Sequence, residues 1–204
     1  MTAKTLRAVV LGCSLKASDQ ESSSELLGRQ VLDALGKHGV AGEFIRVADR
    51  AIAFGVSTDE GGADQWPDIR ATILRADILI IATPIWLGQP SSVAKMVLER
   101  LDAELSEKDG QGRLLTFGKV AAAAVVGNED GAHHVCAELF QALNDVGFTV
   151  AASAATYWVG EAMQKADYND VGPKPDTTDV ATRTLAVNVA HLARLLTAHP
   201  YPPN

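Results

Sequence analysis

Three polar segments of the 204-residue sequence carry side chains suited to binding an anionic, planar ligand. The first segment, residues 12–24, contains a lysine and several serines whose hydroxyls can donate hydrogen bonds to a phosphate: Ser14, Lys16, Ser22, Ser23 and Ser24. A helix that begins at these serines would add free backbone N–H groups and the positive end of its dipole. The segment therefore predicts a phosphate site, although it is neither a GxxxxGKS/T P-loop nor a GxGxxG fingerprint.

Helix capping is a simpler interpretation of the same serines. Ser23 or Ser24 could accept a hydrogen bond from the first helical turn, with Glu25 favourably placed at the positive end of the dipole. Capping uses one hydroxyl, however, and leaves the other serines, Ser14 and Lys16 without a role. We therefore favour the phosphate interpretation.

The second and third segments predict contacts with a flat ring. The second segment consists of Thr83, Pro84, Ile85, Trp86, Leu87 and Gly88. Its proline favours an extended backbone, and its tryptophan offers a face on which a planar ligand could stack. Packing of Trp86 on the protein surface or at a subunit contact is the alternative. The third segment consists of Gly127, Asn128, Glu129, Asp130 and Gly131, which alone predict only a turn.

Two other chemistries lack the partners they require. Cys13 follows an apolar run, as does the nucleophile of low-molecular-weight tyrosine phosphatases, but Asp19 stands where the Cys-x5-Arg motif needs arginine. His133 and His134 precede Glu138 on one predicted helix, with no third metal ligand in reach, so we predict no metal site. His133 is better interpreted as a candidate contact to a substrate.

Composition limits the class of protein. With 47% hydrophobic residues, the chain is long enough for one packed domain, expected over residues 1–204. A net charge of −7 argues against nucleic-acid binding. Since no apolar run reaches about 18 residues, we expect no association with a membrane. The start of the chain lacks a signal-peptide cleavage site, and Cys13 and Cys136 form no disulfide or CxxC pattern, so we expect a cytoplasmic location.

Short apolar runs alternate with longer stretches of helical periodicity. The runs at residues 8–11, 44–47, 78–82, 120–126 and 150–156 predict strands, and the stripes between and after them predict helices. This alternation is typical of an α/β protein with an open parallel sheet and helices on both faces. Ligands of such sheets bind at the carboxyl ends of the strands. The three polar segments follow the first, third and fourth predicted strands, so we expect them at one edge of the molecule.

Three further segments of the sequence have recognisable patterns. Tyr157 and Trp158 end the last predicted strand at the same edge and are candidates for lining a substrate pocket. Residues 160–178, rich in glycine, proline and aspartate, predict an excursion over the surface. The acidic residues at 102–109 predict a solvated helix face and turn.

Taken together, the motifs resemble those of the flavodoxin-like NAD(P)H-dependent FMN reductase family. The resemblance lies in Ser-x-Lys followed by Ser-Ser-Ser-Glu-Leu-Leu, in Thr-Pro-Ile-Trp-Leu-Gly-Gln-Pro-Ser-Ser and in Gly-Asn-Glu-Asp-Gly-Ala, and it covers about residues 6–158. It implies a three-layer sandwich whose five-stranded parallel sheet has the order 2-1-3-4-5. It also implies that Ser14, Lys16, Ser23 and Ser24 hold the FMN phosphate. Family members frequently have arginine at the position of Lys16 and Asn-Thr at the position of Ser23 and Ser24.

The resemblance further implies how the ring is held and what the protein does. Residues 84–88 would run beside the isoalloxazine, with Trp86 flanking it, and residues 128–131 would touch its other edge. The implied activity is electron transfer from NAD(P)H through FMN to a small acceptor such as a quinone or free flavin, in a homodimer or larger homo-oligomer. A flavodoxin-like electron carrier without NAD(P)H turnover, and a flavin-binding module without turnover, remain alternatives.

Overall fold

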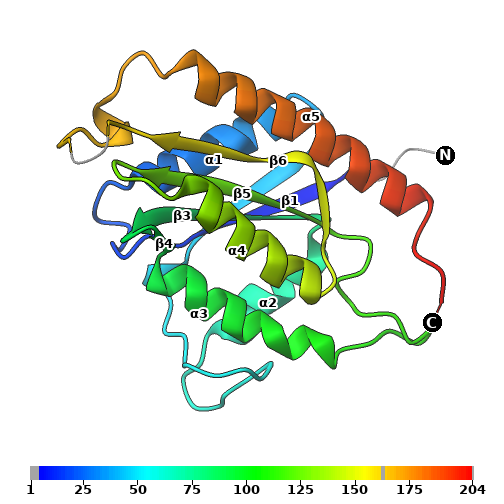
Figure 1. The fold of residues 1–204 in the computed structure, drawn as a ribbon. Helices are drawn as coiled ribbons and strands as arrows, with labels where there is room; N and C mark the ends of the chain where they lie inside the picture. The colour runs from blue at the N-terminus through cyan, green and yellow to red at the C-terminus, as the bar shows by residue number, and fades with distance from the viewer. Residues whose placement is uncertain (1–4, 162–163, 204) are drawn as a thin grey trace.

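The computed structural model describes residues 5–161 and 164–203 and contains a mainly parallel sheet (Figure 1). Its parallel strands are β1 (Arg7–Gly12), β2 (Ala41–Arg46), β3 (Ile78–Trp86), β5 (Val120–Gly127) and β6 (Thr149–Val159), arranged in the order β2-β1-β3-β5-β6. Counting only these strands, the order is the predicted 2-1-3-4-5, which is confirmed. The short strand β4 (Gln89–Pro90), which pairs antiparallel with the end of β3, was not predicted.

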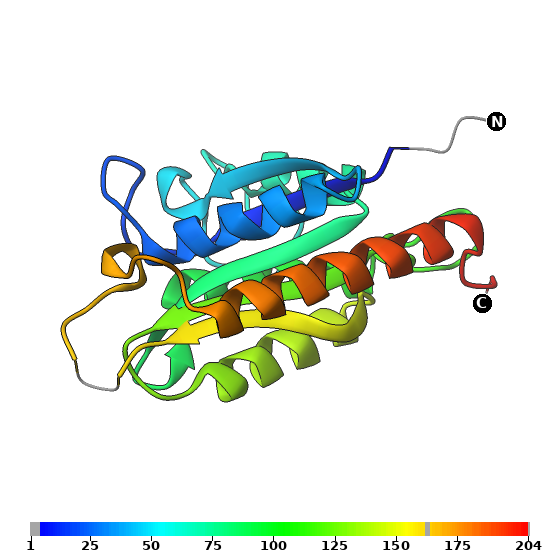
Figure 2. The same cartoon turned by 90° about the horizontal axis from the view of Figure 1, so that it is seen from above.

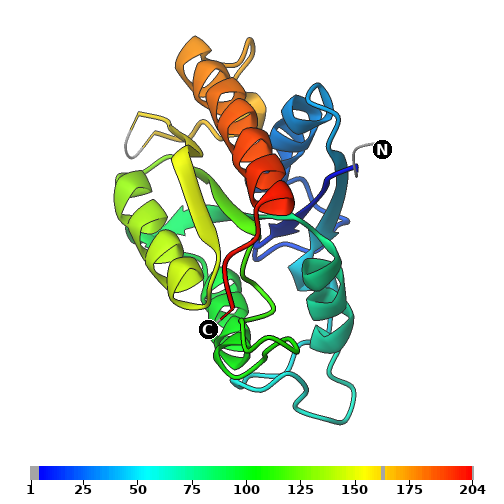
Figure 3. The ribbon, with the colours of Figure 1, turned by 90° about the vertical axis from the view of Figure 1, so that its right-hand side faces the viewer.

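Helices cover both faces of the sheet and complete three layers (Figures 2 and 3). Helices α1 (Ser23–Gly36) and α5 (Asp176–Ala198) lie side by side on one face. Helices α2 (Trp66–Arg75), α3 (Ser92–Leu101) and α4 (Ala132–Asp145) lie on the other. Short 3-10 turns are η1 (Val47–Asp49), η2 (Asp102–Leu105) and η3 (Tyr168–Asp170). Within the described part of the chain, no helix combines the length and the hydropathy needed to cross a bilayer.

The two central strands, β3 and β5, bury every residue of their apolar runs. Ile78 to Ala82 and Val120 to Val125 are all at most 1% exposed. Alternate side chains enter opposite cores: Leu79 packs toward α2 to α4, and Ile80 packs toward α1 and α5. Each buried methylene contributes about 0.8 kcal/mol, so these runs anchor both layers to the sheet. This explains why they are continuously apolar rather than alternating.

The expectation of a solvated acidic face is wrong for one residue. Glu104, in η2, is only 1% exposed, and its carboxylate accepts hydrogen bonds from Nε and Nη2 of Arg70 at 2.6 and 3.2 Å. Glu107, which is more exposed, also accepts from Arg70 at 2.9 Å. The guanidinium from α2 compensates the burial of the Glu104 charge, and local periodicity could not reveal a partner 34 residues away.

The expectation that residues 160–178 run over the surface is wrong for η3. Tyr168 is 1% exposed, its hydroxyl donates to Oε1 of Gln30 at 2.8 Å, and its ring centroid lies 5.4 Å from that of Trp158. The ammonium of Lys174 lies over the same ring and donates to the Tyr168 and Val171 carbonyls. η3 is therefore docked beside the start of α1 (Figure 2).

A buried arginine organises the loop between β2 and α2. Arg100 of α3 is completely buried and donates to the carbonyl oxygens of Ala53 and Ser57 at 2.8 and 3.0 Å. It also pairs with Asp64 at 2.8 Å. Burial alone would raise the pKa of Asp64, but hydrogen bonds from three backbone N–H groups and from Arg100 hold that pKa at about 2. Asp64 therefore stays charged opposite Arg100 throughout the neutral pH range.

We expect the close approach of α1 to the sheet to depend on Gly28. A Cβ at Gly28 would lie 3.0 Å from Cγ1 of Val10 and 3.1 Å from Cβ of Ala82, whereas a Cβ at Gly36, in the same helix, would meet nothing within 4 Å. The substitution Gly28→Leu should lower the free energy of unfolding in urea by about 1 to 3 kcal/mol through overpacking. Gly36→Leu is the matched control and should leave it unchanged or raise it; equal effects would contradict this account.

Candidate functional site

The carboxyl ends of the strands bring the three predicted segments together at one edge of the molecule, on the left of Figure 1. A cavity of about 200 Å³ lies between them. Its walls come from all three segments and from the chain that follows β6: Ser14, Leu15, Lys16, Ser22, Ser23, Ser24, Pro84, Ile85, Trp86, Val126, Gly127, Asn128, Trp158, Asp167 and Tyr168. The predicted convergence of serine hydroxyls with an aromatic loop is therefore present in the fold.

The serines at the start of α1 keep hydroxyl hydrogens available for a ligand. Ser22 is the N-cap residue, and its Oγ accepts from the Glu25 N–H at 3.3 Å and contacts Oγ of Ser24 at 3.0 Å. Oγ of Ser23 accepts from the Asn169 N–H at 3.3 Å, and Oγ of Ser14 accepts from the Lys16 N–H at 3.1 Å. Ser14 and Ser23, which accept in these bonds, still have their own hydrogens to donate, and the bond between Ser22 and Ser24 uses one of that pair's two hydrogens and leaves the other.

The identity of the N-cap residue bears on whether the serines cap the helix or bind a phosphate. Because Ser22 caps the helix, the alternative in which Ser23 or Ser24 is the cap is wrong. Those two residues are the first of α1, and the N–H groups of a first turn have no partner within the helix. Lys16 is exposed at the rim, with Nζ 3.4 Å from the carbonyl oxygen of Glu21. The loop therefore offers hydroxyls, a helix N-terminus and one exposed cation to an anion.

The second segment forms the tip of a β-hairpin. Trp86 pairs with Gln89 across the turn, and the turn residues Leu87 and Gly88 both have positive φ, +53° and +74°. Glycine adopts this conformation freely, but leucine pays a steric cost there. Trp86 is 52% exposed and lines the cavity, whereas Leu87 is 92% exposed and points away from the protein. The hairpin thus presents a half-exposed indole at the mouth of the cavity.

Glu129 joins the third segment to this hairpin. Its carboxylate accepts hydrogen bonds from the backbone N–H groups of Leu87 and Gly88 at 3.1 and 3.2 Å. The two backbones also touch, because a Cβ at Gly131 would lie 2.8 Å from Cα of Gly88. Among the residues that line the cavity as described, Leu87, Gly88, Glu129, Asp130 and Gly131 are absent. The contacts of Glu129 and Gly131 fasten the two loops to each other.

Thr83 supports the site from beneath. It is completely buried, and its Oγ1 accepts from the N–H of Ser91 at 3.2 Å. The Ser91 hydroxyl donates to the carbonyl oxygen of Cys13 at 2.6 Å. These bonds connect the ends of β1 and β3 to the N-cap of α3, so the first and second segments rest on one buried hydrogen-bonded network.

The substrate-pocket candidates fall into two groups. Trp158 lines the cavity, and a Cβ at Gly160 would lie 2.6 Å from its ring, so the indole packs directly over that glycine. His133 and Tyr157 contact each other, with Nε2 and Oη 2.9 Å apart and the rings edge to face, but they do not line the cavity in the described structure. A role for these two residues in substrate binding stays a prediction.

Four lining residues were not predicted: Leu15, Val126, Asp167 and Tyr168. Tyr168 left a signal in the sequence, since it is the lone aromatic residue in the polar stretch at 160–178. Its burial against Trp158 and Gln30 brings Asp167 to the cavity. No local pattern indicates that a loop after the last strand returns to the start of the first helix.

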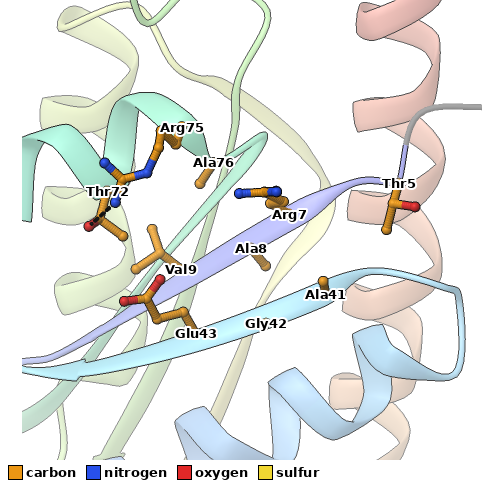
Figure 4. Close-up of a pocket in the computed structure, with 10 residues that line it drawn as sticks. All are labelled: Thr5, Arg7, Ala8, Val9, Ala41, Gly42, Glu43, Thr72, Arg75 and Ala76. Atoms are coloured by element: carbon orange, nitrogen blue, oxygen red, sulfur yellow. Dashed lines mark hydrogen bonds between the residues drawn. The ribbon is translucent and has the colours of Figure 1, made fainter.

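A larger concavity, of about 640 Å³, lies at the amino ends of β1 and β2 (Figure 4). Its charged side chains are Arg7, Glu43 and Arg75, and Arg75 donates to Oγ1 of Thr72 at 2.9 Å. It contains none of the predicted site residues and lies at the edge opposite the three segments. The candidate site is therefore the smaller cavity at the carboxyl edge.

Neither cysteine chemistry nor a metal centre is supported by the described residues. Burial raises the pKa of the Cys13 thiol far above its usual range and raises the pKa of Cys136 to about 11. Among residues 5–161 and 164–203, no three histidine, cysteine or acidic side chains are grouped so that they could hold a metal ion. His134 instead contacts Gln89 at 2.9 Å and Glu138 at 2.8 Å.

The sheet order and the site at its carboxyl edge define a flavodoxin-like protein. Over residues 6–164 the sequence matches the model of the family described as NADPH-dependent FMN reductase. The chain therefore belongs to this family of flavin-binding oxidoreductases.

Individual relatives extend this finding. The chain is 34% identical over 207 residues to the 8-demethyl-8-aminoriboflavin-5'-phosphate synthase of Streptomyces davaonensis, covering 96% of this chain and 80% of the relative. The crystal structure of RosB with bound 8-demethyl-8-formylriboflavin-5'-phosphate superposes with a TM-score of 0.89 at 32% identity, covering 96% and 82% of the two chains. The chain is also 35% identical over 200 residues to the divalent metal cation transporter MntH of Mycobacterium bovis; the match covers 95% of this chain but spans only 29% of that relative's length.

We expect Glu129→Ala to loosen the hairpin. The N–H groups of Leu87 and Gly88 would lose their acceptor, and the positive φ of Leu87 would lose its restraint. Hydrogen exchange at these two amides should become roughly tenfold faster. Asp130→Ala is the control, since Asp130 is exposed and accepts only from the adjacent Gly131 N–H. Unchanged exchange in Glu129→Ala would rule out the fastening role.

We expect both thiols to be inert in the native protein. Raised pKa values keep Cys13 and Cys136 protonated at pH 8, and burial blocks access to them. Titration with Ellman's reagent at pH 8 should detect no rapidly reacting thiol in the folded chain and two after denaturation. One equivalent that reacts within seconds in the folded protein would contradict the burial of one of the two thiols, and peptide mapping of the labelled cysteine would show whether a nucleophilic role of Cys13 is reopened.

Proposed function

We propose that this chain binds FMN at the carboxyl edge and uses it to pass electrons from NAD(P)H to a small acceptor such as a quinone or free flavin. The observation that carries the proposal is the convergence, in one cavity, of the serine-rich start of α1 with the Pro84 to Trp86 loop. The first provides donors for a phosphate, and the second provides a flat apolar wall. FMN contains both an anionic group and a planar ring.

The residues of the site fit FMN by their donor chemistry. Ser14, Ser22, Ser23 and Ser24 supply hydroxyls, α1 supplies N–H groups, and Lys16 supplies a charge for the phosphate. The cavity, at about 200 Å³, is smaller than the roughly 300 Å³ of a small typical ligand pocket. We therefore expect the phosphate and ribityl chain to lie inside it and the ring to lie toward the half-exposed Trp86.

Chain residues would position the ring and keep it dry, while FMN would supply the hydride and electron chemistry when bound. Burying ~200 Å² of flat ring at about 25 cal/mol per Å² gives about 5 kcal/mol before ordering costs. A screened charge or a helix end gives about 1 kcal/mol each. The ring loops should therefore provide more of the affinity, and the serine loop should fix the orientation.

Flavin binding and turnover are tested in two steps. Purified protein titrated with FMN should shift and sharpen the visible flavin spectrum, with saturation at micromolar concentrations. Stopped-flow mixing with NADH or NADPH should then bleach the bound flavin, and a quinone or free flavin should restore its colour. Bound FMN that neither nucleotide reduces would favour an electron carrier, and no binding at micromolar FMN would overturn the proposal.

A second candidate is an enzyme that modifies the flavin itself. It is favoured by the extent of similarity to the aminoriboflavin-phosphate synthase and to RosB, which covers nearly the whole of this chain. In that case FMN would be the substrate, held by the same phosphate site. Mass spectrometry of the flavin released after incubation with a nitrogen donor and an oxidant distinguishes the candidates: a reductase returns FMN of unchanged mass, and a modifying enzyme returns a flavin of altered mass.

We also propose a homodimer in a cytoplasmic setting. The exposed Trp86 and Leu87 at the cavity mouth are apolar surface that a second subunit could cover, completing the wall around the ring. The two free cysteines suit a reducing compartment. Light scattering during size-exclusion chromatography should give twice the 21.5 kDa chain mass, and a monomer would oppose the shared wall.

A further inference from the structure

We propose that Arg46, at the end of β2, is the positioning residue that shapes the phosphate end of the site. The inference rests on the FMN binding proposed above and adds a residue that lies outside the cavity lining. Arg46 acts through the loop between β1 and α1 and through Glu25, not by contact with the ligand.

The side chain of Arg46 is buried behind the phosphate loop. The residue is only 8% exposed, and its Nη1 donates to three carbonyl oxygens of that loop: Lys16 at 3.0 Å, Ala17 at 2.7 Å and Gln20 at 3.1 Å. Its Nη2 pairs with the carboxylate of Glu25 in the first turn of α1. One guanidinium therefore joins the loop to the helix that follows it.

The first consequence concerns the orientation of the loop. Carbonyl oxygens at residues 16, 17 and 20 all accept from the same cation, which does not line the cavity as described. Carbonyl dipoles turned toward the cavity would repel a phosphate. Because Arg46 binds these three carbonyl oxygens, the polar groups that remain to face the anion are the hydroxyls and the helix N–H groups.

The second consequence concerns charge. Glu25 lies one residue after Ser24, at the helix end that offers its N–H groups to the ligand. An unpaired carboxylate there would oppose the binding of a dianion. Arg46 neutralises it from the buried side, while Arg29 pairs with it from solvent at 2.6 Å. The two hydrogens of Nη1 are shared among the three carbonyls while Nη2 faces Glu25, and a lysine, with its donors on one nitrogen, could not occupy both positions at once.

The chain contains a matched control for a merely structural arginine. Arg100 is also buried, donates to two loop carbonyls and pairs with one carboxylate, Asp64. Its loop, at residues 53–64, contributes no residue to the cavity as described. Loss of either arginine should destabilise the fold, but only loss of Arg46 should change the recognition of a phosphate.

The experiment compares FMN with riboflavin, which carries the same ring without the phosphate. Dissociation constants for both flavins are measured by fluorescence quenching for the wild type, Arg46→Met, Arg46→Lys and Arg100→Met, with unfolding curves for each. Arg46→Met should weaken FMN binding roughly 10- to 100-fold and leave riboflavin binding within about twofold, with Arg46→Lys intermediate. Arg100→Met should lose stability and keep the wild-type ratio of the two constants.

If Arg46→Met does not fold, Arg46→Lys decides by the same ratio. A ratio that stays within twofold of the wild type in the Arg46 variants, or that changes equally in Arg100→Met, overturns the role of Arg46 while the proposed function stands. A wild type that binds FMN no better than riboflavin also overturns it. A wild type that binds neither flavin overturns the proposed function and, with it, this inference.

Discussion

Burial of β3 and β5 on both faces determines where this protein can hold a ligand. Their apolar runs are fully enclosed between the two helical layers, so the side chains of these runs meet neither solvent nor a polar ligand. The ends of the strands, where the chain leaves the two cores, are left to contact a ligand. Because the main strands run parallel, their carboxyl ends meet at one edge, and the loops that leave them must meet there too. The position of the site follows from this constraint before any particular ligand is considered.

Buried polar bonds then convert adjacent loops into a defined cavity. Thr83 and Ser91 connect the ends of two strands, Glu129 joins two loops through backbone amides, and Arg46 gathers the carbonyls of the serine loop. Several of these bonds join groups far apart in the sequence: the Ser91 hydroxyl reaches Cys13 across 78 positions, and Glu129 reaches the two hairpin amides across 42 and 41. Each such hydrogen bond adds only a modest net free energy of stabilisation. A buried donor or acceptor without a partner, however, destabilises the fold, so these bonds favour one arrangement of the loops. The ligand-facing hydroxyls are positioned by groups that do not face the ligand.

Small changes around the flavin ring could decide whether a protein of this family uses flavin as a cofactor or as a substrate. The proposed phosphate site would serve a flavin that is a tightly held cofactor and a flavin that is a substrate equally well, because it would recognise the tail and not the reacting ring. What distinguishes the two functions must lie around the ring, where Trp86 is half exposed and the hairpin turn places leucine at positive φ. A wall that a second subunit completes would belong to this part of the site.

Local patterns predicted the parallel strands and the meeting of the three segments at their carboxyl edge, and the resemblance to the family added the order of the strands. Continuous apolar runs indicated strands buried on both faces, and their polarity placed Ser14, Trp86 and Asn128 at one edge. Local patterns could not reveal contacts between distant residues. Tyr168 reaches Gln30 across 138 positions, Arg46 reaches the serine loop across 26 to 30, and Glu104 finds Arg70 across 34. Sequence periodicity indicates which face of an element is buried, but it does not indicate which partner a buried charge or hydroxyl contacts. The tertiary structure alone decided those partners, because they depend on how the layers pack against one another.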